Sequence, residues 1–385
     1  MRQRIIGAAV FVSSCIFLLI VGELAMSRFL FSGYYVWPPD FHRTFEVRPD
    51  IIAGVSTPSE LTISEDGFRG DPLSREASYR ILAIGGSTTI CVYLDDSKAW
   101  PYLVQNQLNE RLGPDAVWVG NAGRPGHSTP SHILQVEKLL AQYPQIDAVV
   151  LLVGVNDALV SLEATIDKPL VFNRSEDAAL RIAFSVFPDW DSDAPWYSRN
   201  VIGRLARIRS WKPIPLEKDG VFSMDAKGEF YSVVRGYRKA ASTYRHKLPD
   251  LSRAVAKYRR NLNAIVDRAA AAQRRVVFLT QPTVWRAGMT QDELDLLWAG
   301  GTDFFRLKRG KPYYSAEVLA EAMALYNAAL LDVCSKRGVE CLDMAERVPR
   351  STATFYDDAH FTEQGSAVVA ARLAEYLAGR APLSR

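Results

Sequence analysis

The amino-acid sequence predicts a three-layer α/β/α domain built on a five-stranded parallel sheet. Strand-like and helix-like patterns alternate along most of the chain, which implies parallel strands joined by right-handed crossovers. The stretch "DAVVLLVG" at residues 147–154 is an unbroken apolar run, typical of a strand buried on both faces. Hydrophobic residues make up 48% of the 385 residues and charged residues 23%, so we expect a folded domain with a substantial core.

The individual elements follow from local patterns along the chain. Short apolar runs bounded by small or polar residues predict strands at 80–85, 116–121, 147–154, 274–280 and 339–344. Apolar residues at helical spacing predict helices at 97–112, 131–142, 249–272, 317–337 and 362–377, the fourth capped by Gly338. We therefore assign residues 80–385 to the α/β domain. Residues 28–79, rich in Pro and aromatic residues, are expected to be an irregular lead-in, and residues 158–248 an insertion without clean periodicity.

Residues 1–27 are expected to anchor the chain in a membrane. Arg2 and Arg4 precede eighteen residues without a charge, Ile5 to Gly22. A helix of that length reaches about 27 Å, enough to cross a bilayer core. The positive-inside bias predicts a single-pass protein with a cytoplasmic N-terminus and its α/β domain in a periplasm or an extracellular space. The alternative is a cleaved signal peptide, but no convincing small-x-small cleavage site follows.

Positive charge is concentrated in one segment of the chain. Residues 204–260 carry 15 Lys/Arg and 5 Asp/Glu, whereas the net charge of the whole chain is only +3. Aromatic residues such as Trp211 and Tyr237 are interleaved with these charges, which favours an acidic glycan as the partner, with an anionic membrane surface as the alternative. A solvated helix face with internal ion pairs would have the same composition. No nucleic acid partner is expected beyond the membrane.

The cysteines fit an oxidising compartment in part. Cys334 lies near the end of a predicted helix and Cys341 in the following strand, and a short loop through Gly338 could bring them close enough to form a disulfide. Two separate buried thiols are the alternative, and Cys91 is expected to be a buried free thiol. The sequence contains no CxxC pair or Cys/His cluster, so no metal site is expected.

The first strand ends in Gly85-Gly86-Ser87 and presents a hydroxyl at the edge where parallel α/β sheets bind ligands. The spacings of phosphate and dinucleotide loops are absent, and no cofactor is expected. A serine nucleophile requires a base. In "FYDDAHFTEQG", Asp357 precedes His360 by three residues, so that one turn can hold a carboxylate beside an imidazole. A polar turn at a helix N-terminus would have the same pattern.

Oxyanion donors are expected at the ends of neighbouring strands. The candidates are the backbone N–H groups of Ser87 and Gly123 and the side-chain amide of Asn156. A capped turn is the alternative explanation for "GVND". We favour a catalytic site because the serine, the glycine, the asparagine and the Asp/His pair all fall at strand ends of one predicted sheet.

These four stretches together resemble the SGNH/GDSL hydrolases, whose Ser, Gly, Asn and His come from four sequence blocks. The matching stretches are "IGGSTT", "GNAGRPG", "VGVND" and "DDAHFTEQG". The resemblance implies a flavodoxin-like sandwich, a triad of Ser87, His360 and Asp357, and oxyanion donors at Ser87, Gly123 and Asn156. Block one reads GGS and not GDS, a departure shared with membrane-anchored members that carry a "GFRG" segment upstream, as this chain does.

The resemblance implies ester chemistry without fixing the reaction. We expect a membrane-anchored serine esterase, a carboxylic ester hydrolase, with O-acetyl groups of an envelope polysaccharide or glycolipid as the favoured substrate. The same site would be an O-acyltransferase if a sugar hydroxyl attacked the acyl-serine in place of water. A third hypothesis is a non-catalytic envelope-assembly protein that keeps the fold as a binding module.

Overall fold

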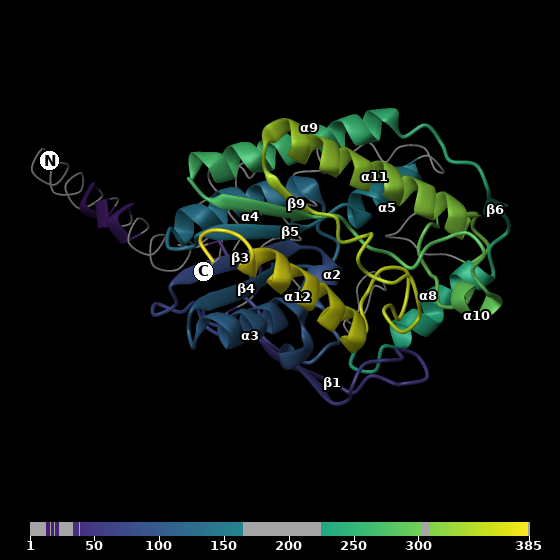
Figure 1. Cartoon of the computed structure of the whole chain (residues 1–385), viewed down its shortest axis with the longest axis horizontal. Coiled ribbons are helices and arrows are strands. Elements are labelled where there is room, and N and C mark those ends of the chain that lie inside the picture. The colour runs from purple at the N-terminus through teal and green to yellow at the C-terminus, as the bar shows by residue number, and fades with distance from the viewer. Residues whose placement is uncertain are drawn as a thin grey trace, which may run out of the picture.

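The computed structural model describes residues 13–15, 17–18, 20–22, 34–37, 39–164, 225–301 and 309–383. Its centre is a parallel sheet of five strands in the order β4-β3-β5-β7-β9 (Figure 1). The strands are β3 (Tyr79–Gly85), β4 (Val117–Gly123), β5 (Ala148–Leu152), β7 (Arg275–Leu279) and β9 (Glu340–Leu342). The predicted five-stranded parallel sheet is therefore confirmed, with strand ends within a few residues of those expected.

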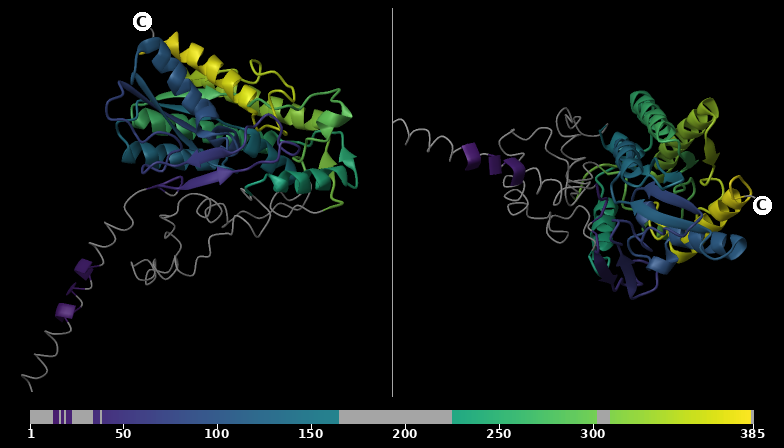
Figure 2. Two further views of the ribbon diagram at one scale, coloured as in Figure 1. Left: turned by 90° about the horizontal axis from the view of Figure 1, so that it is seen from below. Right: turned by 90° about the vertical axis from the view of Figure 1, so that its left-hand side faces the viewer.

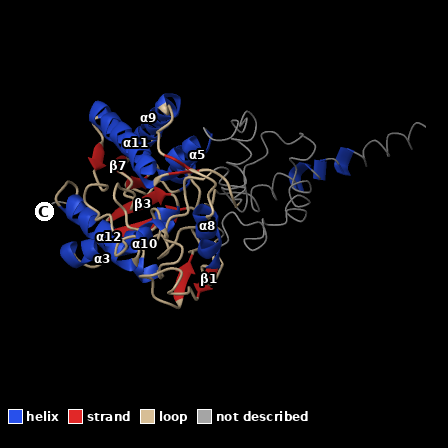
Figure 3. Cartoon of the chain, turned by 90° about the vertical axis from the view of Figure 1, so that its right-hand side faces the viewer, coloured by secondary structure: helices blue, strands red, loops and turns tan. Residues whose placement is uncertain are grey.

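Helices cover both faces of the sheet (Figure 3). On one face α3 (Trp100–Leu112) lies beside α12 (Glu363–Ala378), and on the other α9 (Ser252–Ala271) packs between α4 (Thr129–Gln142) and α11 (Ala316–Arg337) (Figure 2). Gly338 ends α11 in the left-handed conformation at φ 62°, as its predicted capping role requires. Because all five strands run parallel, their carboxyl ends lie at the same edge of the sheet.

Two helices were missing from the expected set. Helix α5 (Val155–Ala164) begins three residues after β5 ends, and α8 (Glu229–Lys239) lies inside the expected insertion. The shorter elements are α2 (Ser87–Ile90), the 3-10 helix η1 (Asp96–Lys98), α10 (Gln291–Leu294) and the paired strands β6 (Tyr244–Arg245) and β8 (Tyr313–Tyr314). Helix α8 mixes buried arginines with aromatic side chains, so its buried face lacks the apolar periodicity by which helices are predicted.

Most of the expected insertion lies outside the described residues, because 165–224 are not described. In the described part of the basic segment, two of the arginine side chains are buried inside the domain. Arg235 is buried and donates to the carbonyl oxygens of Ile51, Leu296 and Tyr356. Arg238 is buried as well and donates to two further main-chain carbonyls. At least these two charges of the basic segment hold loops together and do not face a partner.

The predicted membrane anchor falls largely on residues that are not described. A short apolar helix, Ser13–Gly22, lies within it. Among the described residues one helix, α11, is long and apolar enough to cross a membrane by length and composition. Half of its most apolar stretch is buried inside the protein, as in the core helix of a globular domain.

The lead-in is more ordered than its sequence suggested. It contains an antiparallel ribbon of β1 (His42–Phe45) and β2 (Ser59–Thr62), which lies at the same end of the molecule as α8 (Figures 1 and 3). Phe45, Ile52 and Phe68 have no exposed surface, so the lead-in contributes to the core of the domain. These short strands pair with, and are buried by, residues that are distant in sequence. For this reason the local sequence pattern of residues 28–79 looked irregular.

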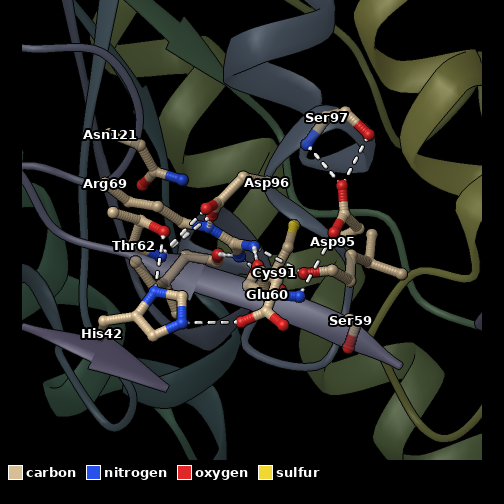
Figure 4. Close-up of polar contacts among 12 residues, drawn as sticks. His42, Ser59, Glu60, Thr62, Arg69, Cys91, Asp95, Asp96, Ser97 and Asn121 are labelled. Atoms are coloured by element: carbon tan, nitrogen blue, oxygen red, sulfur yellow. Dashed lines mark hydrogen bonds and ion pairs between the residues drawn. The ribbon is translucent and has the colours of Figure 1, made fainter. Parts of the chain in front are cut away.

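Arg69 of the "GFRG" segment joins the lead-in to the turn that follows β3. Its side chain is 1% exposed and pairs with Asp96 (Figure 4). Its guanidinium also donates to the carbonyl oxygens of Ile90 at 2.5 Å, Cys91 at 2.7 Å and Leu94 at 2.5 Å. These carbonyls lie at the last residue of α2 and in the turn after it, and the carbonyl of Cys91 also accepts from the main-chain N–H of Leu94. Arg69 therefore fixes the segment that begins with Ser87.

A disulfide links Cys334, in the last turn of α11, to Cys341 in β9, with Cα atoms 6.1 Å apart. The turn through Gly338 brings the two cysteines together, as the sequence analysis expected for an oxidising compartment. Cys91 is a buried free thiol, and burial raises its pKa to about 11, which keeps it protonated and unreactive.

We expect non-reduced peptide maps of the protein to contain the Cys334–Cys341 bridge. Replacing both cysteines by alanine should lower the free energy of unfolding by about 2 kcal/mol, as estimated for so short a loop. Denaturation with and without reductant measures this loss, and Cys91→Ala, which leaves the bridge intact, is the control. Alkylation of Cys334 and Cys341 without reductant would contradict the bridge.

We expect Arg69→Met to lower the free energy of unfolding by at least about 3 kcal/mol, because buried carbonyl groups and Asp96 lose their partner. The matched control is Arg80→Met, since Arg80 also donates to two main-chain carbonyls but is only partly buried. That variant should lose less than about 1.5 kcal/mol. Equal losses in urea denaturation would show that Arg69 has no special structural role.

Candidate active site

Ser87 lies where β3 passes directly into α2 at the carboxyl edge of the sheet. It is the first residue of that short helix, and Gly86 before it is the N-cap. The first N–H groups of a helix have no partner within the helix, so the Ser87 N–H is a candidate donor to a bound group. The hydroxyl of Ser87 lies 2.7 Å from Nε2 of His360.

His360 comes from the loop that enters α12, far from Ser87 in sequence. Its other ring nitrogen, Nδ1, lies 2.6 Å from Oδ2 of Asp357. The structure thus brings the three predicted triad residues into one hydrogen-bonded series, from the Asp357 carboxylate through the imidazole to the Ser87 hydroxyl. This order fixes the tautomer: Nδ1 carries the proton toward Asp357, and Nε2 is free to accept the proton of the serine.

Four hydrogen bonds hold the Asp357 carboxylate. Oδ1 accepts from the N–H groups of Ala359 at 3.0 Å and His360 at 2.8 Å. Oδ2 accepts from His360 and from the indole Nε1 of Trp298 at 2.9 Å. Burial alone would raise the pKa of Asp357, but the charge of His360, the hydrogen bond to its ring and the two main-chain hydrogen bonds from Ala359 and His360 lower it. Asp357 therefore stays ionised.

The interaction with Asp357 that lowers the pKa of the carboxylate raises the pKa of His360. Burial favours the neutral imidazole, but the charge of Asp357, the hydrogen bond to it and the charge of Asp358 outweigh burial. The pKa of His360 is consequently raised above its ordinary value. A more basic imidazole takes the serine proton more readily, provided that the pH keeps it neutral beforehand.

Asp358 is a second buried carboxylate next to the triad. Its Oδ1 accepts from the indole of Trp285 at 2.7 Å, and its Oδ2 accepts from the main-chain N–H groups of Trp298 at 2.8 Å and Ala299 at 3.1 Å. Burial and the adjacent charge of Asp357 raise the pKa of Asp358, and Arg238 opposes the rise. Asp358 thus ties the loop at 298–299 to the loop that carries His360.

Asn156 lies in the first turn of α5 and lines the pocket beside Ser87. One hydrogen of its amide is donated to the carbonyl of His127 at 2.7 Å, which orients the group and leaves its second hydrogen for a ligand. A β-carbon at Gly86 would lie 2.7 Å from this amide nitrogen. The glycine in the "GGS" turn therefore lets the amide approach the serine closely.

Gly123 does not occupy the position expected of an oxyanion donor. It is the last residue of β4, fully packed, and its N–H donates to the Asn121 side chain at 2.9 Å. A β-carbon there would lie 2.3 Å from the main-chain nitrogen of Ile90, so Gly123 is needed for close packing of β4 against α2. Its N–H points to Asn121, not into the pocket.

Gly126 fits the role better than Gly123. It is exposed and left-handed at φ 78°, in the loop that follows β4. Its neighbour Pro125 lines the pocket, and its other neighbour, His127, binds the Asn156 amide. The stretch "GNAGRPG" contains two glycines after Asn121, Gly123 and Gly126, and their spacing does not reveal which of the two lies beyond the end of the strand.

The pocket next to Ser87 is walled mainly by aromatic and aliphatic side chains. The apolar side chains that line it are Val92, Tyr93, Pro125, Val155, Leu159, Phe230, Tyr231, Trp298, Ala299, Tyr356 and Ala359. Tyr356 stacks on the His360 ring at 5.6 Å between centroids, and the Tyr231 hydroxyl lies 3.5 Å from Nδ1 of His360. Sequence analysis did not find Tyr231, Trp298 or Tyr356, because no local pattern relates them to the triad.

Within the described ranges, no group of three or more His, Cys, Asp or Glu side chains is placed to hold a metal ion.

Comparisons with known proteins found similar solved structures but no matching family model and no matching curated protein. The chain is similar to the structure of LAE5, an alpha/beta hydrolase enzyme from the metagenome of Lake Arreo, with 13% identity, a TM-score of 0.43 and coverage of 80% of this chain and 98% of that chain. It is also similar to the structure of the acetyl xylan esterase AlAXEase, with 12% identity and a TM-score of 0.40. That match covers 77% of this chain and 99% of that chain.

A third structure is described as a lipolytic protein of the G-D-S-L family from Desulfitobacterium hafniense. It has 10% identity and a TM-score of 0.38, over 77% of this chain and 99% of that chain. The solved structures to which the chain is similar thus include GDSL-type hydrolases and acetylxylan esterases. At these identities and TM-scores the likeness carries no argument, so both the fold and the chemistry are argued from the chain's own residues.

Proposed function

We propose that the protein is a serine esterase whose nucleophile is Ser87, whose base is His360 and whose orienting acid is Asp357. The observation that carries this proposal is the hydrogen-bonded series from Asp357 through His360 to Ser87, at 2.6 and 2.7 Å, beside a pocket. Three side chains from two distant segments meet in the order that nucleophilic catalysis requires. A non-catalytic role would leave this alignment unexplained.

In the proposed reaction Ser87 Oγ attacks the ester carbonyl while its proton moves to Nε2 of His360. The tetrahedral oxyanion is stabilised by the Ser87 N–H and the Asn156 amide, and we propose the Gly126 N–H as a third donor in place of Gly123. His360 then gives its proton to the leaving alcohol oxygen, which departs from the acyl-serine. Water then attacks the acyl-serine while His360 takes one of its protons. His360 passes that proton to Ser87 Oγ as the acyl–oxygen bond breaks, which releases the carboxylic acid and the free serine.

We further propose that the substrate is an ester, foremost an O-acetyl ester, on an envelope polysaccharide or glycolipid. The aromatic side chains around the pocket support this, because aromatic faces stack well on sugar rings. They also favour the O-acyltransferase as a second candidate, since a stacked sugar could occupy the place of water. Assays of a chromogenic acetyl ester with and without an acceptor glycan distinguish the two reactions.

The location that we propose is a single-pass membrane protein with its α/β domain on the outer side. Four large side chains near the N-terminus, Phe17, Leu18, Ile20 and Val21, are 45–68% exposed and apolar, which suits a lipid environment. The Cys334–Cys341 disulfide suits an oxidising compartment. Protease protection in intact cells tests the orientation.

Ser87→Ala and His360→Ala should each reduce ester cleavage by several powers of ten. Asp357→Asn should cost less than either, and Asn156→Ala about a hundredfold, as for one lost oxyanion donor. The full chain in detergent is assayed with a chromogenic acetyl ester. Thr88→Val is the matched control, because Thr88 lines the same pocket but its hydroxyl donates to Gln281 and not to His360. Full activity of Ser87→Ala would refute the esterase.

The raised pKa of His360 predicts a shifted pH profile. The base must be neutral, so kcat/KM should fall as the pH drops through the pKa of His360, with a midpoint above the ordinary value of about 6.5. Asp357→Asn removes the charge that raises this pKa, and its residual activity should therefore have a lower midpoint. The same midpoint in both proteins would contradict the proposed pairing.

A further inference from the structure

Trp298 binds both carboxylates of the buried Asp357–Asp358 pair through different groups. Its main-chain N–H donates to Asp358 Oδ2 at 2.8 Å, and its indole Nε1 donates to Asp357 Oδ2 at 2.9 Å. The side chain is 6% exposed. The main-chain bond fixes the start of the side chain, so that the indole is directed at the catalytic carboxylate.

The oxygen that receives the indole is the one that receives His360. Nδ1 of His360 lies 2.6 Å from the same Oδ2. Two donors therefore share one oxygen, and each competes for its negative charge. A donor that withdraws charge from Oδ2 weakens its attraction for the imidazolium and lowers the proton affinity of His360.

We propose that Trp298 is a positioning residue that sets the basicity of His360 through its indole bond to Asp357. The proposal rests on the proposed triad. It adds the Trp298 indole, which acts on His360 through Asp357 and not by direct contact with the reacting atoms. The indole holds the Asp357 carboxylate in hydrogen-bonding position for His360. It also withdraws negative charge from Oδ2 and so lowers the pKa of the imidazole.

Other charged and titratable groups face the same pair and are left unchanged by the test below. Asp358 adjoins Asp357 in sequence, Tyr231 and Arg238 approach from α8, and Tyr93 and Tyr356 pack nearby. Arg238 acts on Asp358, and the tyrosines remain protonated because burial raises their pKa. Loss of the indole bond is therefore the change that reaches Asp357 directly.

Trp285 provides an internal comparison. Its indole donates to Asp358 Oδ1 at 2.7 Å, so it makes the same kind of bond to the neighbouring carboxylate. Its side chain is 1% exposed, and replacing either tryptophan by phenylalanine retains an aromatic ring and removes the N–H. The two variants differ in which carboxylate loses a donor.

The experiment compares the pH dependence of kcat/KM for a small acetyl ester in the wild type, Trp298→Phe and Trp285→Phe. Trp298→Phe should move the acid limb to higher pH by about half a unit. At pH values below the midpoint, kcat/KM should therefore fall roughly threefold. Trp285→Phe should leave the limb in place or move it to lower pH, since a less ionised Asp358 attracts the imidazolium less. An unmoved limb in Trp298→Phe, or an equal upward shift in both variants, overturns the proposal.

A measurement on the wild type covers the case in which Trp298→Phe does not fold. In protein labelled with ¹⁵N in its indoles, the Trp298 resonance is assigned through its ring contacts with Phe230 and Tyr231. It should titrate together with the imidazole resonances of His360. If no indole resonance titrates with that midpoint, the proposal fails. These NMR readouts need no turnover, so a wild type without esterase activity would overturn the proposed function while still testing the link between Trp298 and His360.

Discussion

The buried carboxylate of Asp357 is the constraint around which this end of the molecule is organised. An ionised carboxylate in the interior is stable only if donors replace the water that it loses. Two donors, the N–H groups of Ala359 and His360, close a tight turn around the carboxylate. Two rings also bind it, the imidazole from the same turn and the Trp298 indole from a separate loop. The position of His360, and with it the alignment of Ser87, follows from satisfying that charge.

The sheet alone does not build the site, because its loops are held by buried arginines from outside the α/β repeat. Arg69 binds the carbonyls after α2, and Arg235 binds those of Ile51 and Tyr356. A planar guanidinium with five donors can join several main-chain segments at once, which lysine cannot do. The lead-in and α8 are thus structural parts of the site, although neither belongs to the repeating pattern of strands and helices.

The sequence predicted the parts of the molecule that depend on local patterns. The five strands, the Gly338 cap and the Asp357–His360 spacing could be predicted, since each depends on residues within one short stretch. Trp298 and Arg69 could not be predicted, because each acts on residues about 20 to 60 positions away, and nothing near them in sequence marks the contact. Gly123 was misplaced for a related reason: its loop contains a second glycine, and only the register of β4 with β3 shows that Gly123 is the last residue of the strand.

Substrate fit and proton affinity are linked in this pocket by shared side chains. Trp298, Tyr231 and Tyr356 line the pocket, and the same three side chains contact Asp357 or His360. A substitution that reshapes the wall of the pocket would therefore also alter the surroundings of the imidazole. Because a general base is most effective when its pKa lies near the working pH, the range of substrates open to this scaffold is limited by the electrostatics of Asp357 as much as by the space beside Ser87.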